Sequence, residues 1–337
     1  MKAMLLEAIS PVERRPLKQV ELPRPEPAGG EIRLRVAACG VCRTDLHVIE
    51  GDLPEQELPI VPGHQIVGIV DSLGTGADGF EIGDRAGIAW LRGTCGVCDD
   101  CRGGRENLCR RSRYTGYHAN GGYAEYAVVP AAYAYHLPDE FDDLAVAPLL
   151  CGGIIGYRAL QRSNVPPGGR LLLYGFGSSA HVVLQLARKR GCTVDVVTRG
   201  ESHRELARRM GADWVGGGGE IPPVPADGAI IFAPAGEIVP DALRAIRSGG
   251  TVACAGIHMT PVPEMEYEPC LFHEKTLTSV EANTREDGRG LLEEAAMVPV
   301  AARVTEFALE EANEALVRLK KDEIDGSAVL RVSGSDA

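Results

Sequence analysis

Residues 170–191, RLLLYGFGSSAHVVLQLARKRG, decide the fold of this chain. The apolar run RLLLY follows a PPGG turn and is typical of a buried parallel strand. Apolar residues then recur at helical spacing until Gly191. Between the strand and the helix, Gly175, Gly177 and Ala180 fit the pattern G-x-G-x-x-G/A, whose glycines permit a tight turn and let a pyrophosphate approach the helix N-terminus. The stretch predicts a dinucleotide site, with a plain strand–helix turn as the alternative.

The region after Gly191 repeats this alternation of strand and helix. TVDVV (193–197) predicts a second strand, and SHRELARRMG (202–211) predicts a second helix with Ser202 and Glu205 as its capping box. Further buried strands are predicted at AIIFA (229–233), GTVACAG (250–256) and KTLTSV (275–280). Strands that alternate with helices indicate a doubly wound parallel sheet.

Residues 1–150 differ from this pattern. Pro and Gly clusters separate short β-branched runs, which is typical of an irregular β-rich domain. These runs are EIRLRVAAC (31–39), QIVGIVDSL (65–73) and YAEYAVV (123–129). After residue 283, two helical patterns surround GLLEEAA and LEEANEALVRLKK, and a last strand is predicted at AVLRV. The predicted fold class is therefore α/β, with a β-rich domain and a doubly wound domain.

Composition limits the partners and the location of the protein. The chain has 337 residues, of which 45% are hydrophobic, so it can bury the cores of two domains. Its net charge of −12 argues against nucleic acid or an anionic membrane as a partner. The start, MKAMLLEAISPVERRP, lacks the apolar core of a secretory signal, and no apolar stretch approaches the ~20 residues that span a bilayer. We therefore expect a cytoplasmic protein.

Residues 95–109, CGVCDDCRGGRENLC, carry four of the ten cysteines at the spacing C-x2-C-x2-C-x7-C. In a reducing cytosol, clustered thiols bind metals more often than they form disulfides. The spacing differs from the bacterial iron–sulfur run C-x2-C-x2-C-x3-C-P, because the last gap is longer and Arg110 follows the last cysteine. Four thiolates suit a structural zinc ion, since they leave no coordination position open. An iron–sulfur cluster and metal-free thiols remain as alternatives.

Other cysteines and histidines occur in three separate motifs, CGVCRTDLH (39–47), PGH (62–64) and LLCGG (149–153). A catalytic zinc ion takes three protein ligands, for example two cysteines and a histidine, and keeps a fourth position open for water or substrate. A lone histidine or cysteine is more often a packed core residue. Because the motifs are far apart in the sequence, their spacing alone leaves both interpretations open.

The residues that end the second strand indicate which dinucleotide binds. An acidic side chain there favours NAD, because it accepts hydrogen bonds from the ribose 2′-hydroxyl and repels the 2′-phosphate of NADP. Asp195 lies inside TVDVV, whereas Thr198 and Arg199 follow its end, with His203 and Arg204 in the next helix. A hydroxyl and a guanidinium suit a phosphate, so the sequence favours NADP(H) over NAD(H). The alternative is that both arginines are solvated surface charges.

Along essentially its whole length the chain resembles the zinc-dependent medium-chain alcohol dehydrogenases. The motifs that carry the resemblance occur in the family's order: CGVCRTDLH, PGHQIVGIV (62–70), EIGDRAGI (81–88), the four-cysteine segment, NGGYAEY (120–126), Cys151-Gly-Gly, GFGSSAH and the closing GSAVLRV. The resemblance implies a GroES-like catalytic domain at 1–152, a Rossmann domain at 153–283 and a return to the catalytic domain at 284–337. It also implies a structural zinc ion held by Cys95, Cys98, Cys101 and Cys109.

The resemblance implies a second zinc ion, the catalytic one, on Cys42, His64 and Cys151. The matching cysteine of the first motif is Cys42, because the family's ligand directly precedes the Arg-Thr-Asp triplet, and Cys39 is then a small buried residue. Asp45 is implied to accept the other ring N–H of His64 and so to fix its tautomer.

The implied function is hydride transfer between NADP(H) and a primary alcohol or its aldehyde, through a zinc-bound alkoxide. In this mechanism Thr44 hydrogen-bonds the alcohol, His47 passes the proton through the cofactor ribose to solvent, and Arg43 contacts the pyrophosphate. A polyol or amino-alcohol dehydrogenase of the same superfamily often has Glu as the third ligand, so Cys151 speaks against it. A zinc-free quinone reductase or a non-catalytic nucleotide-binding protein would lack the zinc ligands.

The chain departs from the family pattern at two further positions. Gln65 stands where the family usually has Glu, which leaves the zinc environment more positive, and Ser327 stands where relatives often have an arginine that binds pyrophosphate. Leu53, Trp90 and Leu150 resemble a pocket wall and predict an aliphatic or aromatic substrate, although ordinary core packing is the alternative. Relatives form dimers and tetramers, so we expect a homo-oligomer of one of these sizes, with a small-molecule substrate and no nucleic acid or membrane partner.

Overall fold

The computed structural model describes residues 1–54, 57–297, 300, 303–324 and 326–332. The chain forms two compact units. Unit 1 contains residues 1–151 and 282–337, and unit 2 contains residues 152–281. The functional division with boundaries after residues 152 and 283 remains a prediction.

Unit 2 is built on a six-stranded sheet in the order β12-β11-β10-β13-β14-β15, with every neighbouring pair parallel. Its strands are β10 (Arg170–Tyr174), β11 (Thr193–Val197), β12 (Trp214–Gly216), β13 (Ala226–Ile231), β14 (Ile246–Cys254) and β15 (Thr276–Ser279). Its helices are α4 (Gly152–Arg162), α5 (Ser178–Lys189), α6 (Glu201–Arg209) and α7 (Val239–Ala245), with short turns η5 (Gly236–Ile238) and η6 (Glu268–Phe272).

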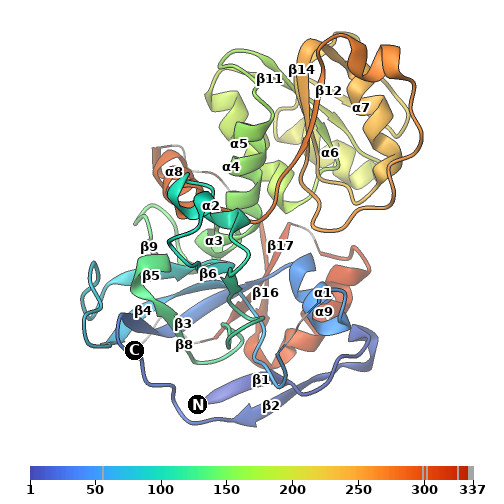
Figure 1. The fold of residues 1–337 in the computed structure, drawn as a ribbon. Coiled ribbons are helices and arrows are strands. Elements are labelled where there is room, and N and C mark those ends of the chain that lie inside the picture. Colours follow the sequence, from blue (N-terminus) through green and yellow to red (C-terminus); the bar gives the residue numbers. More distant parts are fainter. Residues whose placement is uncertain (55–56, 298–299, 301–302, 325, 333–337) are drawn as a thin grey trace. The chain divides into compact units, whose positions relative to one another are not determined.

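The order of the strands reverses at β10, which lies between β11 and β13. Figure 1 shows α5 and α7 on opposite sides of this sheet. Because helices cover both faces, the central strands are buried on both sides, as the apolar run of β10 predicts. The loops that follow β10 and β11 therefore reach the same edge of the sheet, where a doubly wound fold binds its ligands.

Two local predictions for unit 2 are wrong. The helix predicted from Ser202 begins at Glu201, and Gly200 is its N-cap, so Ser202 and Glu205 form no capping box. The Gly200 carbonyl already accepts the N–H of Arg204, which starts the helix before Ser202. The strand KTLTSV was predicted to be buried, but β15 is the last strand of the sheet and most of its residues are exposed.

Unit 1 contains a seven-stranded sheet in the order β16-β17-β3-β4-β5-β9, with β8 also paired to β3. Its strands are β3 (Glu31–Val41), β4 (Gln65–Leu73), β5 (Arg85–Ile88), β8 (Tyr126–Pro130), β9 (Ala134–His136), β16 (Val304–Ala308) and β17 (Ser327–Arg331). Two small antiparallel pairs join β1 (Lys2–Leu6) to β2 (Leu17–Glu21) and β6 (Leu91–Gly93) to β7 (Arg113–Tyr114).

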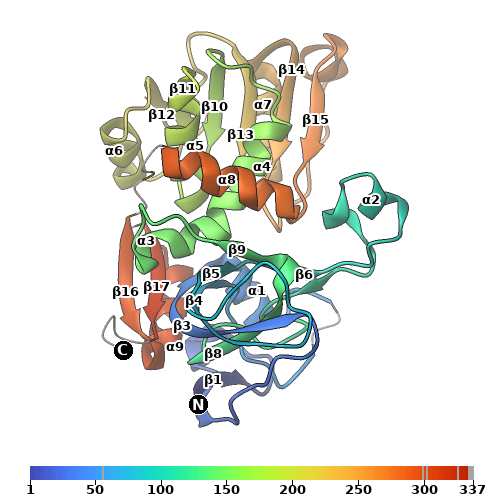
Figure 2. The ribbon, with the colours of Figure 1, turned by 90° about the vertical axis from the view of Figure 1, so that its left-hand side faces the viewer.

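Short helices connect the strands of unit 1. They are α1 (Arg43–Glu50), α2 (Asp99–Arg102), α3 (Asp143–Val146), α8 (Arg285–Met297) and α9 (Ala312–Lys320), with 3-10 turns η1 (Val12–Arg14), η2 (Glu106–Leu108), η3 (Ala131–Tyr133), η4 (Ala147–Leu150) and η7 (Leu309–Glu311). Figure 2 shows the C-terminal strands β16 and β17 beside β3 and β4. Because β17 pairs antiparallel with β3, the end of the chain completes the sheet that carries the N-terminal motifs.

One apolar core holds the sheet of unit 1 together. It includes Ile32 and Leu34 of β3, Ile66 of β4 and Leu330 of β17, all of them fully buried. Among the described residues, no single helix is long and apolar enough to cross a membrane. The consecutive pair Asp143–Leu150 and Gly152–Arg162 meets that test of length and composition only when both members are taken together.

Candidate functional site

Three donor side chains from distant parts of unit 1 converge at one point. Cys42 is the N-cap of α1, His64 directly precedes β4, and Cys151 directly follows η4. The Sγ atom of Cys42 lies 3.5 Å from Nε2 of His64 and 3.8 Å from Sγ of Cys151. Neither cysteine forms a disulfide. We call these three residues the two-cysteine cluster.

The spacing of these donors fits a metal ion. All three donor atoms lie within 4.8 Å of one another. A tetrahedral zinc ion with Zn–S bonds of about 2.3 Å and a Zn–N bond of about 2.0–2.1 Å separates two sulfurs by about 3.8 Å, and a sulfur from a nitrogen by about 3.5 Å. The two observed distances have these values. Two thiols and an imidazole are also the donor types that zinc prefers.

A buried carboxylate orients His64. Oδ1 of Asp45 lies 3.3 Å from Nδ1 of His64, and both side chains are almost fully buried. Neither atom makes a hydrogen bond of good geometry with a described residue, and the charge of Asp45 acts on His64 at this short distance. Burial lowers the pKa of His64, but the charges of Asp45 and Cys42 raise it to about 10. Asp45 thus favours a proton on Nδ1, while Nε2 faces the thiols.

Asp45 also caps the helix that carries Cys42. Its Oδ2 accepts the backbone N–H of Cys42 at 2.8 Å, and α1 ends at Glu50 with Gly51 as its C-cap, whose φ of 80° is left-handed. Left-handed backbone is accessible to glycine without steric cost. One carboxylate therefore fixes both the start of α1 and the ring of His64.

The neighbours of the cluster include residues that are not donors. Cys39 is fully buried, and burial raises its pKa well above the usual range. Gln65 is buried too, and its Nε2 makes no hydrogen bond with a described residue. Gln65 packs on Gly40, where an added Cβ would lie 2.6 Å from its Oε1.

The predicted relay residues lie on α1. Thr44 and His47 belong to this helix, which begins next to Cys42. Nδ1 of His47 lies 2.8 Å from Oδ2 of Asp52, a partner that the sequence analysis did not identify. Arg43, also on α1, forms an exposed ion pair with Asp322.

An aromatic group surrounds His64. The ring of Trp90 meets that of His64 edge to face, with centroids 4.9 Å apart. Tyr114 stacks on Trp90 at 4.9 Å and 15°, and Tyr117 lies 5.8 Å from it. Tyr114 and Tyr117 were missed by the sequence analysis, although the run YTGYH (114–118) is rich in rings.

The other two predicted pocket residues are less directly tied to the cluster. Leu150 is buried and precedes Cys151 in the chain, whereas Leu53 is partly buried in the segment that follows α1. Of the three predicted pocket residues, Trp90 makes a ring contact with His64.

The four remaining clustered cysteines meet near the surface of unit 1. Their sulfurs lie within 4.8 Å of one another, and those of Cys95 and Cys101 are 3.8 Å apart. The backbone N–H of Val97 and the Arg111 side chain lower the pKa of Cys95 to about 5, because both interact with its sulfur. We call residues 95–109 the four-cysteine lobe. Its donors are Cys95, Cys98, Cys101 and Cys109.

In unit 2, the glycine-rich turn follows β10 and begins α5. Gly175 has a φ of 87°, and an added Cβ would lie 3.1 Å from the backbone nitrogen of Ala233. Gly177 is the N-cap of α5, with no side-chain cap and open space where a Cβ would stand. Ala180 is fully buried against the unit's core. The backbone N–H groups of this helix start can therefore face an anion.

The end of β11 separates the predicted phosphate residues into two groups. Arg204 donates through Nη1 to the carbonyl oxygens of Thr198 and Arg199, at 3.2 and 2.7 Å, and it pairs with Glu201. The guanidinium of Arg199 makes no ion pair or hydrogen bond with a described residue. His203 lies in the first turn of α6.

The carboxylate of Asp195 is already engaged within the sheet. It is fully buried in the middle of β11, and its Oδ2 lies 2.6 Å from Nη1 of Arg170. It is therefore a structural ion-pair partner, in agreement with its position inside the strand.

Comparisons with known proteins agree with this architecture. Residues 28–139 match the alcohol dehydrogenase GroES-like domain family, and residues 180–297 match the zinc-binding dehydrogenase family. The chain is 49% identical over 337 residues to a probable alcohol dehydrogenase AdhA of Mycobacterium tuberculosis (strain CDC 1551 / Oshkosh), covering 98% of this chain and 97% of that protein. It is 35% identical to an alcohol dehydrogenase of Geobacillus stearothermophilus, covering 98% of this chain and 100% of the relative.

A solved structure of an NAD-dependent alcohol dehydrogenase is 25% identical and superposes with a TM-score of 0.90, covering 99% of this chain and 100% of that chain. The matches confirm the predicted α/β fold with a GroES-like domain and a Rossmann-like domain. This chain is an alcohol dehydrogenase and belongs to the zinc-dependent medium-chain alcohol dehydrogenase family.

Proposed function

We propose that this chain transfers a hydride between NADP(H) and a primary alcohol or its aldehyde at the two-cysteine cluster. The observation that carries the proposal is the donor spacing of 3.5 and 3.8 Å, which suits a tetrahedral zinc ion. Three protein donors leave the fourth position to the substrate oxygen. When bound, zinc supplies Lewis acidity that lowers the pKa of the alcohol hydroxyl or polarises the aldehyde carbonyl, and the nicotinamide accepts or donates the hydride.

The chain's own residues move the proton. The hydroxyl of Thr44 can accept the proton of the alcohol while it gives up its own, and His47 can pass a proton on through the ribose of a bound cofactor to solvent. Asp52 lies 2.8 Å from Nδ1 of His47, so the carboxylate can accept a hydrogen bond from that nitrogen and orient the ring. In aldehyde reduction the same groups deliver a proton to the carbonyl oxygen.

The four-cysteine lobe is proposed to hold the second zinc ion. Its four sulfurs occupy every position of a tetrahedral site, so no position is left for substrate. The separation of 3.8 Å between Cys95 and Cys101 matches the edge of such a site. The role of this ion is therefore structural.

NADP(H) is the proposed dinucleotide. Arg199 is the candidate for the 2′-phosphate, because its guanidinium makes no hydrogen bond or ion pair with a described residue and the hydroxyl of Thr198 is next to it in the chain. Its charge does act on Glu237, whose pKa it lowers. Arg204 also supports the turn, through its hydrogen bonds to the two carbonyls. His203 is a further candidate at the same turn. Arg43 remains a candidate for binding the pyrophosphate. To do so, its guanidinium would leave its ion pair with Asp322.

Trp90 favours an apolar substrate, aliphatic or aromatic. Its ring contacts His64, and Tyr114 stacks on it, so an apolar aromatic surface borders one of the proposed zinc ligands. A polyol or amino-alcohol dehydrogenase is the weaker candidate, since the third donor is Cys151. Retention of all three donors also speaks against a quinone reductase of the zinc-free type or a non-catalytic nucleotide-binding protein.

We further propose that the chain works as a homo-oligomer in the cytoplasm. The edge strand β15 exposes its backbone and Leu277, and the exposed ring of Phe272 belongs to the preceding turn. An exposed strand edge is a template for pairing with another chain, so a second copy is the proposed partner. The formal charge of −12 gives no support for a nucleic acid partner.

The experiment is a panel of aliphatic and aromatic aldehydes assayed with NADPH and with NADH at equal concentration. Turnover with a clear preference for NADPH supports the proposal. Turnover with a preference for NADH would keep the enzyme class and make Arg199 a surface charge. Absence of turnover with either cofactor, in protein that contains zinc, would contradict the proposed reaction.

A further inference from the structure

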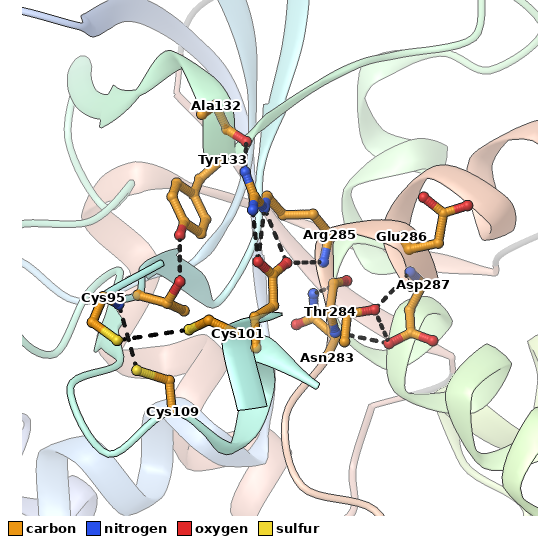
Figure 3. Close-up of polar contacts among 12 residues, drawn as sticks. Cys95, Cys101, Cys109, Ala132, Tyr133, Asn283, Thr284, Arg285, Glu286 and Asp287 are labelled. Carbon is orange, nitrogen blue, oxygen red and sulfur yellow. Dashed lines mark hydrogen bonds and ion pairs between the residues drawn. The ribbon is translucent and has the colours of Figure 1, made fainter. Parts of the chain in front are cut away.

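A single buried carboxylate connects the four-cysteine lobe to the start of α8. Glu106 lies between the third and fourth cysteines of the lobe and is only 8% exposed. Its Oε1 accepts the backbone N–H of Arg285 at 2.8 Å and the side-chain Nε at 2.9 Å, and its Oε2 accepts Nη2 at 2.7 Å (Figure 3). One carboxylate therefore binds both the main chain and the side chain of a residue 179 positions away.

Two residues of η3, Ala132 and Tyr133, hold Arg285 from a second side. The guanidinium of Arg285 lies 4.6 Å from the ring centroid of Tyr133, and Nη1 donates to the carbonyl oxygen of Ala132 at 3.4 Å (Figure 3). The hydroxyl of Tyr133 is hydrogen-bonded to Thr94, which directly precedes the first cysteine of the lobe. Burial raises the pKa of Glu106, but the hydrogen bonds and charge of Arg285 outweigh this effect, and the net pKa is lowered. The carboxylate is therefore stabilised in its charged form.

Arg285 begins α8 directly after the chain enters unit 1. The entry residue, Ala282, has a left-handed φ of 46°, which is unfavourable for a residue with a Cβ and persists where neighbouring contacts impose it. Thr284 and Asp287 cap the helix reciprocally: Asp287 accepts the backbone N–H of Thr284 at 2.7 Å, and the Thr284 hydroxyl accepts the N–H of Asp287 at 3.1 Å. These contacts are local, whereas Glu106 ties the helix start to the lobe.

The lobe itself has almost no apolar core. Within residues 95–109 only Glu106, Asn107 and Cys109 are buried, and the regular elements α2 and η2 are four and three residues long. Helices of this length are not stable on their own. The donor set of the lobe is thus the feature that can fix its shape, because zinc binding to four thiolates supplies folding free energy directly.

We propose that the zinc-loaded lobe holds Glu106 in position and through it fixes residues 283–287 at the start of α8. Glu106 is a positioning residue in this account, and the lobe anchors the point at which the chain returns to unit 1. Only the first step, in which zinc holds the lobe and Glu106 in position, rests on the proposed structural zinc. The Glu106–Arg285 contact is itself present in the structure.

Hydrogen–deuterium exchange on the full-length protein tests the proposal, because the backbone N–H of Arg285 is bonded to Glu106. We expect at least a tenfold faster exchange at residues 284–287 in Glu106→Gln, and the same in Cys98→Ser, whose lobe lacks one zinc donor. The double variant Glu106→Gln/Cys98→Ser should exchange no faster than the faster of the two single variants, because both changes act through the same contact. Asp100→Asn is the matched control, since Asp100 pairs with Arg105 inside the lobe and not with α8. It should leave the exchange unchanged.

Zinc content measured on the same samples separates loss of the metal from the lobe from loss of the Glu106–Arg285 contact. A Cys98→Ser protein that has lost one zinc ion but keeps slow exchange at Arg285 would overturn the proposal. A Cys98→Ser protein that retains both ions and slow exchange would overturn the structural-zinc assignment together with the metal-dependent step. If Glu106→Gln does not fold, Arg285→Lys keeps the charge and removes the forked contact. Unchanged exchange in that variant would also contradict the anchor.

Discussion

The two-cysteine cluster and the four-cysteine lobe of unit 1 use similar donors, but the donors are brought together in different ways. Cys42 and Cys151 of the two-cysteine cluster are 109 positions apart, and the third donor is the fully buried His64. The four donors of the lobe fall within fifteen residues. Burial does not separate the cysteines of the two sites, since Cys42 and Cys151 are partly buried and so are three of the lobe's four. The first cluster depends on the folded sheet for its geometry, while the lobe's donors are brought together by a local loop. A metal site with an open coordination position therefore depends on a rigid scaffold, whereas a closed four-thiolate site can itself stabilise the loop that carries it.

The largest expected effect separates the clusters by activity. Cys42→Ser should lower kcat/KM at least about a thousandfold, because the Lewis acid supplies several kcal/mol of stabilisation in the transition state. Steady-state kinetics and a cofactor-binding titration measure this, and cofactor binding should persist. Cys39→Ala is the matched control, since Cys39 is a buried neighbour outside the cluster. Equal loss of activity in both variants would point to packing and not to a metal donor.

The second largest expected effect is on thermal stability and distinguishes the four-cysteine lobe from the two-cysteine cluster. Cys98→Ser should lower the unfolding temperature by roughly 5 °C or more, because the lobe has little apolar core to replace the metal. Turnover per folded chain should stay within a few-fold of the wild type. Calorimetry and kinetics on the same preparation check both statements. A Cys98→Ser protein that melts like the wild type but has lost turnover would contradict a structural role for the four-cysteine lobe and indicate a catalytic one.

The cofactor residues of unit 2 predict a smaller effect. Arg199→Ala should raise the KM for NADPH roughly tenfold or more, since a hydrogen bond to a charged group contributes about 1.5–3 kcal/mol. The KM for NADH should change little. Arg204→Ala should affect both cofactors alike, because Arg204 holds the carbonyls of Thr198 and Arg199. An equal change for both cofactors in Arg199→Ala would remove its phosphate role.

The smallest effect concerns pH. The pKa of Glu106 is lowered in the folded state, so its ion pair adds stability above the unfolded pKa of about 4.3, and this is lost as pH falls through the folded pKa. Glu106→Gln should therefore lower the free energy of unfolding at pH 7 and remove this part of the acid dependence. Denaturant titrations between pH 7 and 3 measure it. Parallel pH profiles for the variant and the wild type would contradict the stabilising charge.

The sequence predicted those features that lie in continuous motifs. The turn with Gly175 and Gly177 lies between β10 and α5 as expected, because a strand, a glycine turn and a helix are locally encoded. The donors of both clusters were named from motifs, and the structure brings each set together. Whether they hold zinc stays a prediction.

Features that depend on tertiary contacts were missed. Neither spacing nor composition links Glu106 to Arg285, nor stacks Tyr114 on Trp90. The helix start at Glu201 was misplaced because capping residues indicate a boundary only to within a residue or two. The exposure of β15 follows from its place at the end of the sheet, which periodicity does not reveal.

The most direct test of the two roles is the zinc content of the wild type, Cys42→Ser and Cys98→Ser, with turnover measured on the same samples. We expect two zinc ions per chain in the wild type and one in each variant, with turnover lost only in Cys42→Ser. A Cys42→Ser protein that keeps wild-type turnover, or a wild type active without zinc, would contradict it.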